Sequence, residues 1–478
     1  MRSVRLWSVR HAGALAVLYR LFIRLAPRLR RSVEWLGPER LERVVAPAER
    51  TIKGFFFDCH MCGRCTLSST GMACPMNCPK LHRNGPCGGV MADGGCELDP
   101  GMRCVWLEAL DGAKRVVGRA DLDPAQIQRP ADQRLRGTSV WIGAIMARDT
   151  AAPESPSEGP AAPGQVREPG ALERACRSGR FVVTAELSPP DSADPQDLLR
   201  RAAPFRGQVD AVNVTDGAGG NCHMGSLAAS ALLAADGYEP VFQIACRDRN
   251  RIAMQGDILG AAALGVRNLL AITGDGVENG DHPQARPVFD LDSVSLLEVA
   301  RGLRDRGAYA SGRSIGARPG LFLGATINPF APPFRERIAN FEKKIAAGAQ
   351  FVQTQYCFDP EMLEAFMQEV RARGIERRCH ILVGVGPLAS ARTARWMLAH
   401  VPGVHIPAQL LHRLEQSADQ RREGTMICVE LIRAVRQMEG IAGVHVMAHR
   451  NESLVPEILR ESGLAAERDA VPPRHGAT

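Results

Sequence analysis

Short apolar runs alternate with longer amphipathic stretches over the second two-thirds of the chain. Runs rich in Val, Ile, Leu and Phe are typical of parallel strands that are buried on both faces. Eight occur, at residues 181–187, 210–215, 239–246, 268–275, 321–327, 351–358, 380–385 and 443–449. Helical periodicity fills the gaps between them, most clearly at 257–265 and 335–349. Eight strands that alternate with helices over about 300 residues predict an α/β fold, a (β/α)8 TIM barrel.

A doubly wound open sheet is the alternative fold for this alternation. That fold places a glycine-rich phosphate-binding turn directly after its first strand. Here the first strand runs into ELSPPDSAD, which contains no glycine. The pattern therefore favours the closed barrel, which we assign to residues 171–478.

Residues 1–50 carry a different pattern, that of a basic amphipathic helix. One face would carry the apolar residues Leu15, Leu18, Phe22, Leu25 and Leu29. The opposite face would carry the arginines Arg20, Arg24, Arg28 and Arg31. Such a helix either lies on an anionic membrane or a partner, or packs on the chain's own body. The second interpretation is favoured, partly because Pro27 is expected to break the helix.

Charge is concentrated in this same segment. Residues 1–50 contain eleven arginines and four glutamates, which already accounts for the net charge of +7 of the whole chain. The rest is neutral overall, which argues against a nucleic-acid groove across the main body. No secretory signal or bilayer-spanning run is recognisable, so we expect a cytoplasmic protein whose thiols stay reduced.

A segment without apolar periodicity precedes the barrel. Residues 148–170 read RDTAAPESPSEGPAAPGQVREPG, a composition dominated by Pro, Ala, Gly and charge. This composition is typical of a flexible linker. It would separate the barrel from a small cysteine-rich domain at residues 51–147.

Eight of the 14 cysteines lie in that domain, at Cys59, Cys62, Cys65, Cys74, Cys78, Cys87, Cys96 and Cys104. Reduced thiols that cluster in this way indicate metal binding, because a four-thiolate shell suits Zn²⁺ or an iron–sulfur cluster. The first three form a CxxCxxC run, and both Cys74 and Cys78 precede a proline, as in ferredoxin-like [4Fe–4S] ligation. Eight cysteines are enough to complete two four-ligand centres, and iron–sulfur is favoured over a structural zinc ribbon. The spacing leaves open which four cysteines share a centre.

Polar residues stand at the carboxyl ends of the predicted strands, where barrel enzymes place their chemistry. They are Glu186, Thr215, Asp275, Gln355 and Arg450. A carboxylic acid at Glu186 could donate a proton, and Asp275 could hold a polarised ring. Each alone would be read as a buried polar residue, but several together indicate a site.

Longer motifs make the chain similar to a known family. Residues 181–460 resemble the methylenetetrahydrofolate reductase family of flavin-containing barrels, through TAELSPP, NVTDGA, ITGD, FEKKIAAGAQFVQTQYCFD and GVHVMAHRNE. Residues 51–145 resemble the cysteine-rich module found beside or fused to such reductases, through CxxCGxC, CPMNCPK, RNGPCGG, CELDP and CVW. Together the two resemblances cover most of the chain.

The resemblance implies reduction of 5,10-methylenetetrahydrofolate to 5-methyltetrahydrofolate by hydride from a bound flavin. It assigns Glu186 as the acid, Asp275 as the carboxylate beside flavin and pterin, and Gln355 as a folate and nicotinamide contact. Arg450 would face the folate tail. The flavin contacts it implies are Thr215, Ala218, Gly274, Asn340 and Lys344, together with the positions of Gln243, Thr273 and Lys343.

Several positions depart from the family pattern. Well-studied members have His at the position of Gln243, Arg at Thr273, Tyr at Asp216 and Arg at Lys343, and Ala391 stands where a lid phenylalanine is expected. FAD is the expected flavin, and these departures leave FMN open. NAD(P)H is the expected donor, and a ferredoxin-type protein that delivers electrons through the cysteine-rich domain is the alternative.

The leading hypothesis is thus a folate oxidoreductase, and the reverse direction, from methyltetrahydrofolate, is left open. Two alternatives stay open: a flavin-free methyl-transfer barrel, and a zinc-stabilised folate-binding or assembly protein. The expected partners are folate and a redox protein, without nucleic acid. A homo-oligomer is expected, and peripheral membrane contact would run through the N-terminal basic helix.

Overall fold

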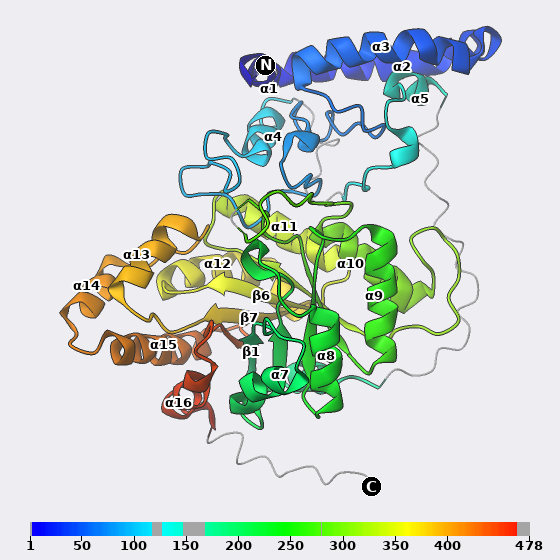
Figure 1. Cartoon of the computed structure of the whole chain (residues 1–478). Helices are drawn as coiled ribbons and strands as arrows, with labels where there is room; N and C mark the ends of the chain where they lie inside the picture. The colour runs from blue at the N-terminus through cyan, green and yellow to red at the C-terminus, as the bar shows by residue number, and fades with distance from the viewer. Residues whose placement is uncertain (1, 117–126, 147–167, 279, 466–478) are drawn as a thin grey trace.

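The computed structural model describes residues 2–116, 127–146, 168–278 and 280–465. Most of the linker predicted at residues 148–170 therefore lies outside the described residues. Three parts follow one another along the chain: a set of N-terminal helices, a cysteine-rich region and a barrel (Figure 1). The cysteine-rich region is defined below as residues 58–116 and 127–146.

Eight parallel strands close into a barrel in the order of the sequence, and β1 completes the ring by pairing with β8. The strands are β1 (Val182–Leu187), β2 (Ala211–Val214), β3 (Pro240–Ala245), β4 (Asn268–Ile272), β5 (Phe322–Ile327), β6 (Phe351–Tyr356), β7 (His380–Val385) and β8 (Gly443–Val446). Each falls within an apolar run, because strands packed between an interior and a helical layer have no solvent face. The predicted TIM barrel is confirmed.

Helices surround the barrel as the periodicity predicted (Figure 1). They are α7 (Pro195–Ala202), α8 (Ser226–Ala235), α9 (Arg251–Ala263), α10 (Ser293–Arg301), α11 (Phe334–Ala347), α12 (Pro360–Ala372), α13 (Ala391–His400), α14 (Ala408–Gln416), α15 (Gln420–Arg436) and α16 (Val455–Glu461). The apolar faces of all but α13 and α14 join the outward side chains of the strands in one continuous core, whereas α13 and α14 contribute to a separate apolar cluster. This rigid frame fixes the directions of the strand ends.

The barrel interior is layered from apolar to polar. At its amino end, α6 (Ala171–Arg177) inserts Leu172 against Val182, Phe322 and Phe351. Because side chains alternate along a strand, Val182, Thr184 and Glu186 all share one side of β1. The interior therefore changes from apolar to polar towards the carboxyl ends of the strands.

Three helices precede the cysteine-rich region: α1 (Arg2–Arg10), α2 (Ala12–Leu36) and α3 (Pro38–Phe57). The expectation that Pro27 breaks the helix is wrong, since α2 runs through it without interruption. Proline removes one backbone hydrogen bond, and the packing of α2 against α3 and α5 (Val140–Ile145) holds the remaining turns in line. Within the described residues, no helix is both long and apolar enough to cross a bilayer.

The cysteine-rich region lies between these helices and the barrel (Figure 1). Apart from α4 (Val105–Ala113) and α5, it consists mainly of turns and two short 3₁₀ segments. Its apolar clusters are small, and each includes a cysteine and residues of the N-terminal helices, as in the cluster of Val9, Cys104 and Trp106. The region therefore has little core of its own.

Candidate active site

A cavity of about 340 Å³ lies at the carboxyl ends of the barrel strands. Its volume is at the lower end of the range of small-molecule sites. Ten of the predicted barrel residues line it: Glu186, Thr215, Ala218, Gln243, Thr273, Gly274, Asp275, Asn340, Lys344 and Gln355. Residues separated by up to 169 positions thus meet at one place because all strand ends point to it.

Glu186 occupies the end of β1, with its side chain 23% exposed. Its Oε2 lies 3.8 Å from Nε2 of His445 on β8. The other ring nitrogen of His445, Nδ1, lies 2.9 Å from the hydroxyl of Thr184. A histidine held from one side in this way presents its second nitrogen to the carboxyl group.

Thr184 and His445 belong to a buried polar layer at the floor of the cavity, which His445 and Gln353 line directly. The amide nitrogen of Gln353 donates to Thr184 Oγ1 at 3.1 Å and to Asn213 Oδ1 at 3.0 Å. The sequence interpretation missed this layer. The signal was available, because Thr184, Asn213 and Gln353 each stand two positions before a predicted site residue and therefore share its side of the strand.

Asp275 is held at the mouth by the loop after β4. Its Oδ2 accepts a hydrogen bond from the backbone N–H of Gly219 at 2.8 Å. The preceding Gly274 has a positive φ of 93°, and a Cβ there would lie 3.1 Å from Arg247 Cβ. Glycine is therefore required for the turn that directs Asp275 to the cavity.

Thr215 provides a test of whether a flavin suits this cavity. Its Oγ1 is buried and has no hydrogen-bond partner in the described part of the chain. A buried hydroxyl without a partner costs free energy, so a bound group that pairs with it would be stabilised. The carboxylate of its neighbour Asp216 already has partners, since it accepts from Ala245 N at 2.8 Å and pairs with Arg249. Thr215 therefore fits the predicted flavin contact.

The predicted phosphate side of the cavity is crowded. Lys344 donates from Nζ to the carbonyl of Thr326, and Asn340 donates to the carbonyl of Asn84 at 3.1 Å. Burial, together with the nearby Arg337 cation, lowers the pKa of Lys344 to about 8. An anion beside Lys344 would relieve this cost by stabilising the ammonium form. Both residues line the cavity, and their present partners are backbone carbonyls.

Three residues lie apart from this group. Lys343 is buried but lines a neighbouring cavity, together with Asn84. Arg450 is exposed, has a left-handed backbone (φ 59°) and lies near Asp191, outside the residues that line the site cavity. Ala391, at the lid position, begins α13 and is buried in an apolar cluster. The cavity itself does not contain these three side chains.

The cysteine-rich region forms one wall of the cavity, which sequence reasoning did not anticipate. Lys80, His82, Cys87 and Glu97 all line it. Lys80 donates from Nζ to the carbonyl of Gly274 at 2.9 Å and pairs with Glu97. Burial lowers the pKa of His82 below its ordinary value. The cavity is thus assembled from two regions that are distant in the sequence.

A short loop of the cysteine-rich region is fixed in the barrel mouth. Arg337 on α11 donates from Nη1 to the carbonyl of Cys87 at 2.8 Å. Asn328 donates to the carbonyl of Gly88 at 3.2 Å. These bonds explain why a barrel arginine stays buried, although burial lowers its pKa to about 10. The loop therefore belongs to the folded mouth.

The eight cysteines separate into two sets of four. The first set, in which Cys74 lies close enough to sense the charge of the other three, is Cys59, Cys62, Cys65 and Cys74. The second set lines one small cavity and consists of Cys78, Cys87, Cys96 and Cys104. Backbone N–H groups point to these sulfurs, for example from Lys80 and His82 to Cys78. The structure thereby supplies the grouping that the spacing left open.

All 14 cysteines are free thiols. Burial raises the pKa of Cys104 to about 11, so this thiol holds its proton at neutral pH unless a cation displaces it. Within the described residues, no three His, Cys, Asp or Glu side chains are placed as ligands of one metal ion. The donor types and the grouping nevertheless suit thiolate ligation.

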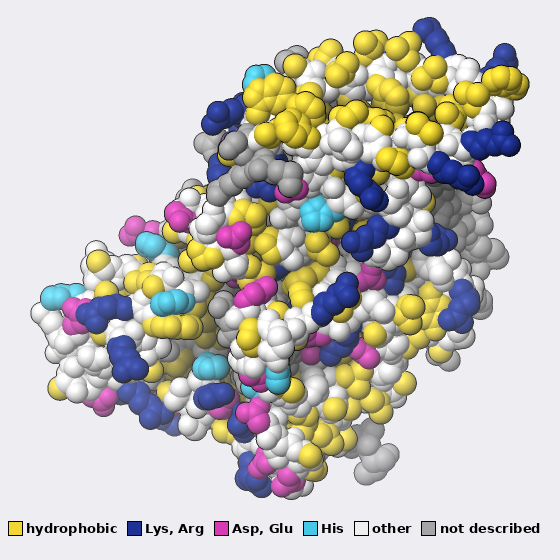
Figure 2. Space-filling view, turned by 45° about the horizontal axis from the view of Figure 1, so that its top comes forward, with side chains coloured by type: hydrophobic (Ala, Val, Ile, Leu, Met, Phe, Trp, Pro, Cys, Tyr) yellow, Lys and Arg dark blue, Asp and Glu magenta, His cyan; other side chains and the backbone are white. Residues whose placement is uncertain are grey.

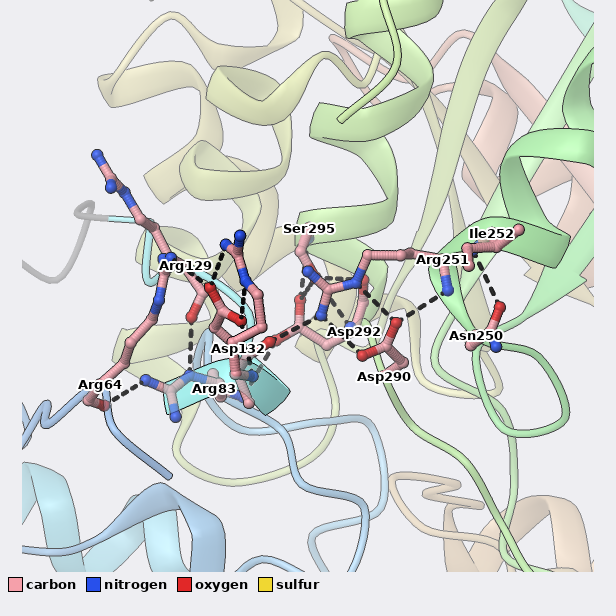
Figure 3. A network of polar contacts seen from close by, with 12 residues as sticks. Arg64, Arg83, Arg129, Asp132, Asn250, Arg251, Ile252, Asp290, Asp292 and Ser295 are labelled. Atoms are coloured by element: carbon pink, nitrogen blue, oxygen red, sulfur yellow. Dashed lines mark hydrogen bonds and ion pairs between the residues drawn. The ribbon is translucent and has the colours of Figure 1, made fainter. Parts of the chain in front are cut away.

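A second, larger cavity of about 740 Å³ lies at the seam between the cysteine-rich region and the barrel. Figure 3 shows the polar network along this seam. Asp292 accepts from the backbone N–H of Arg83 at 3.0 Å and from the side chain of Asn84. Arg251 pairs with Asp290 at 2.7 Å and donates to the carbonyl of Ala131 at 2.8 Å. These contacts join the cysteine-rich region to the barrel.

A closed parallel barrel with a polar cavity at its carboxyl end defines a (β/α)8 barrel protein of the enzyme type. The family model described as "Methylenetetrahydrofolate reductase" matches residues 171–463, and the chain belongs to that family. A second model, "Methylene-tetrahydrofolate reductase C terminal", matches residues 39–134, on the amino side of the barrel. Both predicted resemblances are confirmed.

Similar proteins carry the same family name. A "Probable methylenetetrahydrofolate reductase (NADPH)" of Caenorhabditis elegans is 28% identical over 243 residues, covering 50% of this chain and 34% of that protein. The "5,10-methylenetetrahydrofolate reductase" of Escherichia coli is 26% identical over 186 residues, covering 38% of this chain and 55% of that protein. The chain thus matches about a third to a half of the length of these curated relatives.

Likeness to solved structures is weaker. A Clostridium thermocellum protein, described as binding two copies of 5-methyl-5,6,7,8-tetrahydrofolic acid, has a TM-score of 0.44 and 12% identity. The match covers 62% of this chain and all of that one. At this level the likeness carries no weight for function.

Proposed function

We propose that the chain reduces 5,10-methylenetetrahydrofolate to 5-methyltetrahydrofolate at the cavity in the barrel mouth. The observation that carries the proposal is the convergence of Glu186, Asp275 and Gln355 on that one cavity. Family membership supports the same chemistry. A reductase of this kind needs an acid, a site for the pterin ring and a bound flavin.

The protein side chains would act in the following way. Glu186 holds a proton for a ring nitrogen of the folate, so that the five-membered ring opens before its carbon is reduced. His445, 3.8 Å away, keeps the carboxyl group oriented. Asp275, fixed by Gly219, accepts from the pterin ring, and Gln355, which lines the same cavity, positions the substrate. Arg450 is proposed to meet the folate tail from outside the cavity.

A flavin bound here would supply the hydride. Thr215, Ala218, Gln243, Thr273, Gly274 and Asp275 would hold its ring system, and Asn340 and Lys344 its phosphate, with Lys343 as an indirect neighbour. FAD is the family expectation, with FMN as the smaller alternative that the crowded phosphate side favours. The buried, unpaired hydroxyl of Thr215 is the feature of this chain that supports such a ligand.

The experiment replaces Glu186 with Gln and measures two half-reactions separately. Removal of a general acid typically costs about 10²–10⁴-fold in rate, so folate turnover should fall by that factor. Reduction of the bound flavin should be unchanged, because it does not need this proton. The matched control is Glu369→Gln on the exposed face of α12, which should alter neither half-reaction.

Two results would overturn the proposal. Folate turnover that survives in Glu186→Gln would remove Glu186 as the acid. Protein purified without any flavin would remove the reductase itself and would support the flavin-free methyl-transfer or folate-binding alternatives. Assay with methyltetrahydrofolate and an electron acceptor tests the reverse direction.

We propose that electrons from a donor protein enter the chain at the second cysteine set and pass from there to the flavin. Cys87 lines both the small cavity of this set and the active-site cavity with Glu186, so a centre there would border directly on a bound flavin. We propose [4Fe–4S] clusters at the two sets, with zinc as the alternative. The donor would then be a ferredoxin-type protein, while NAD(P)H stays the alternative of the wider family.

Anaerobic purification with iron, zinc and flavin quantitation tests this proposed route of electron transfer. Cys87→Ser should lower the iron content and slow flavin reduction by a ferredoxin-type donor, while chemically reduced flavin still supports folate turnover. Cys222→Ser, at an exposed barrel cysteine, is the control. Zinc without iron would defeat the relay and leave the region as a docking module. We further propose a cytoplasmic location and assembly as a homo-oligomer.

A further inference from the structure

The N-terminal helices expose an unusually apolar surface. Among the described residues, twelve of the eighteen exposed large hydrophobic side chains lie on α1, α2 and α3. Figure 2 shows them gathered over these helices, with arginines around their edges. We call this surface the hairpin face and define it by Val17, Leu18, Leu21, Leu25, Leu29, Trp35, Val44, Ile52 and Phe55. Large apolar patches on a protein surface mark an interaction site.

The hairpin face is the outer side of a fixed element. On its inner side α2 packs through small residues, and Ala12, Ala16 and Ala26 are all buried. Buried Glu49 of α3 accepts hydrogen bonds from Lys53, from Ser139 Oγ and from Trp141 N. Arg5 of α1 pairs with buried Glu108 at 3.1 Å. Because the inner contacts fix the orientation, the leucine face cannot turn inward without breaking them.

The leucines form a continuous stripe. Leu18, Leu21, Leu25 and Leu29 recur at spacings of three and four residues, so they lie along one side of α2. Their side chains are 63%, 53%, 39% and 45% exposed. At the far end of the helix, Trp35 is 84% exposed. Leucines in a row with an exposed tryptophan are typical of helices that lie in a membrane interface.

The charges beside the leucine stripe indicate which kind of partner binds the hairpin face. Arg24, Arg28 and Arg31 of α2 are exposed, and in the described part of the chain they form no ion pair. Arg40, Arg43 and Arg50 of α3 are exposed as well. Long arginine side chains can reach phosphate groups while their stems cover apolar surface. The rim therefore complements an anionic headgroup layer.

The same charges disfavour a second copy of this chain. A symmetric dimer through the hairpin face would bring two arginine rims together, because the same patch lies on both sides of a two-fold interface. Residues 1–50 carry a net charge of +7, so the two faces would repel each other. An acidic surface is needed, and a bilayer that contains anionic lipids provides one together with an apolar layer.

We propose that the hairpin face binds the surface of an anionic phospholipid membrane, with α2 and α3 lying in the interfacial layer. The leucines and Trp35 enter the acyl boundary, and the arginines bind lipid phosphates. The cysteine-rich region then lies between the membrane and the barrel, as its place in Figure 1 requires. This binding is independent of the proposed reductase activity.

The test is co-sedimentation of the full chain with phosphatidylcholine vesicles, prepared with and without phosphatidylglycerol. Two triple variants separate the contributions: Leu18→Ser with Leu21→Ser and Leu25→Ser, and Arg24→Glu with Arg28→Glu and Arg31→Glu. A basic residue at an anionic surface strengthens partitioning on the order of five-fold, so the arginine variant should bind on the order of 100-fold more weakly. The leucine variant should lose binding to both vesicle types.

Matched controls carry the same changes on the barrel. They are Leu264→Ser with Trp396→Ser and Leu398→Ser, and Arg306→Glu with Arg378→Glu and Arg392→Glu, all at exposed positions. Both controls should bind like the unmodified chain. Circular dichroism verifies that each variant is folded. If the leucine variant does not fold, the arginine variant alone still tests the proposal.

Three outcomes would overturn the proposal. The first is no binding of the unmodified chain to vesicles with phosphatidylglycerol. The second is binding that the arginine reversals leave unchanged, which would mean non-specific adsorption. The third is a dimer, seen by light scattering, that the leucine variant dissociates while vesicles do not compete with it; the hairpin face would then belong to a second copy.

Discussion

The barrel and the cysteine-rich region contribute to one cavity but are stabilised in different ways. The barrel has eight strands and a continuous apolar core around them. The cysteine-rich region has short helices, turns and small clusters that include Cys74 or Cys104. The comparison teaches that hydrophobic burial is sufficient to define the barrel, whereas the cysteine-rich region depends on its thiols and its neighbours.

The largest effect is expected from one cysteine in each region. Cys78→Ser removes a member of the second cysteine set, so a bound centre should be lost together with the local structure that it holds. Cys428→Ser changes a buried thiol in the barrel core, where a hydroxyl without a partner costs about 1–3 kcal/mol. Metal quantitation and limited proteolysis measure the first effect, and thermal unfolding measures the second.

Two results would contradict the predicted difference between Cys78→Ser and Cys428→Ser. Unchanged metal content in Cys78→Ser would mean that the second set holds no centre. Loss of metal in Cys428→Ser would mean that the two regions are not independent in the way the comparison requires.

A smaller effect is expected at the seam. Asp292→Ala leaves the buried Arg83 N–H without its acceptor and leaves the Asn84 amide with the Gln128 carbonyl alone, which should lower the free energy of unfolding by about 3 kcal/mol. Asp290→Ala is the matched control, since its pair with Arg251 is partly exposed and should contribute about 1 kcal/mol. Denaturant titration of both variants, followed by tryptophan fluorescence, compares them. Equal losses would mean that the buried network does not couple the regions.

The smallest effect is a pH dependence from Lys344. Its pKa falls from 10.5 to about 8 in the folded chain, chiefly because of burial. Above about pH 8 the folded state loses this proton while the unfolded state keeps it until about pH 10.5, so stability should rise with pH in that window. Lys344→Met should remove this rise, whereas Lys114→Met at an exposed lysine should keep it.

Melting temperatures of the unmodified chain and both variants, measured between about pH 8 and pH 10.5, test this prediction. Each variant lacks one lysine and keeps every other titrating group, so the comparison separates the effect of Lys344 from the loss of any lysine. An identical rise in Lys344→Met would mean that this lysine stays charged in the cavity.

Much of the barrel was predictable because its information is local. Each strand is an apolar run, and Glu186, Thr215, Asp275 and Gln355 follow or end such runs. A closed parallel barrel brings all carboxyl ends of its strands to one mouth, so the fold alone placed these residues together. Thr184, Asn213 and Gln353 of the polar layer had the same two-residue signal and were missed, whereas His445 had none, because Met447 stands two positions after it.

The N-terminal helices show the limit of periodicity. The sequence identified an amphipathic helix, but it did not identify which side would be buried. In the structure the alanines Ala12, Ala16 and Ala26 face inward, and the leucine stripe remains outside. Small residues allow close approach of helices, whereas the pattern alone suggests that the larger apolar side chains are covered.

The sequence by itself determined the barrel, the clustering of the cysteines and the strand-end residues, because spacing and composition encode them within a few turns or strands. Only the tertiary structure decided which four cysteines stand together. It also decided that Lys80, Cys87 and Glu97 form a wall of the cavity beside Asp275. These depend on contacts between residues far apart in the sequence, such as Lys80 with Gly274, 194 positions away, and Cys87 with Arg337, 250 positions away, which no local pattern records.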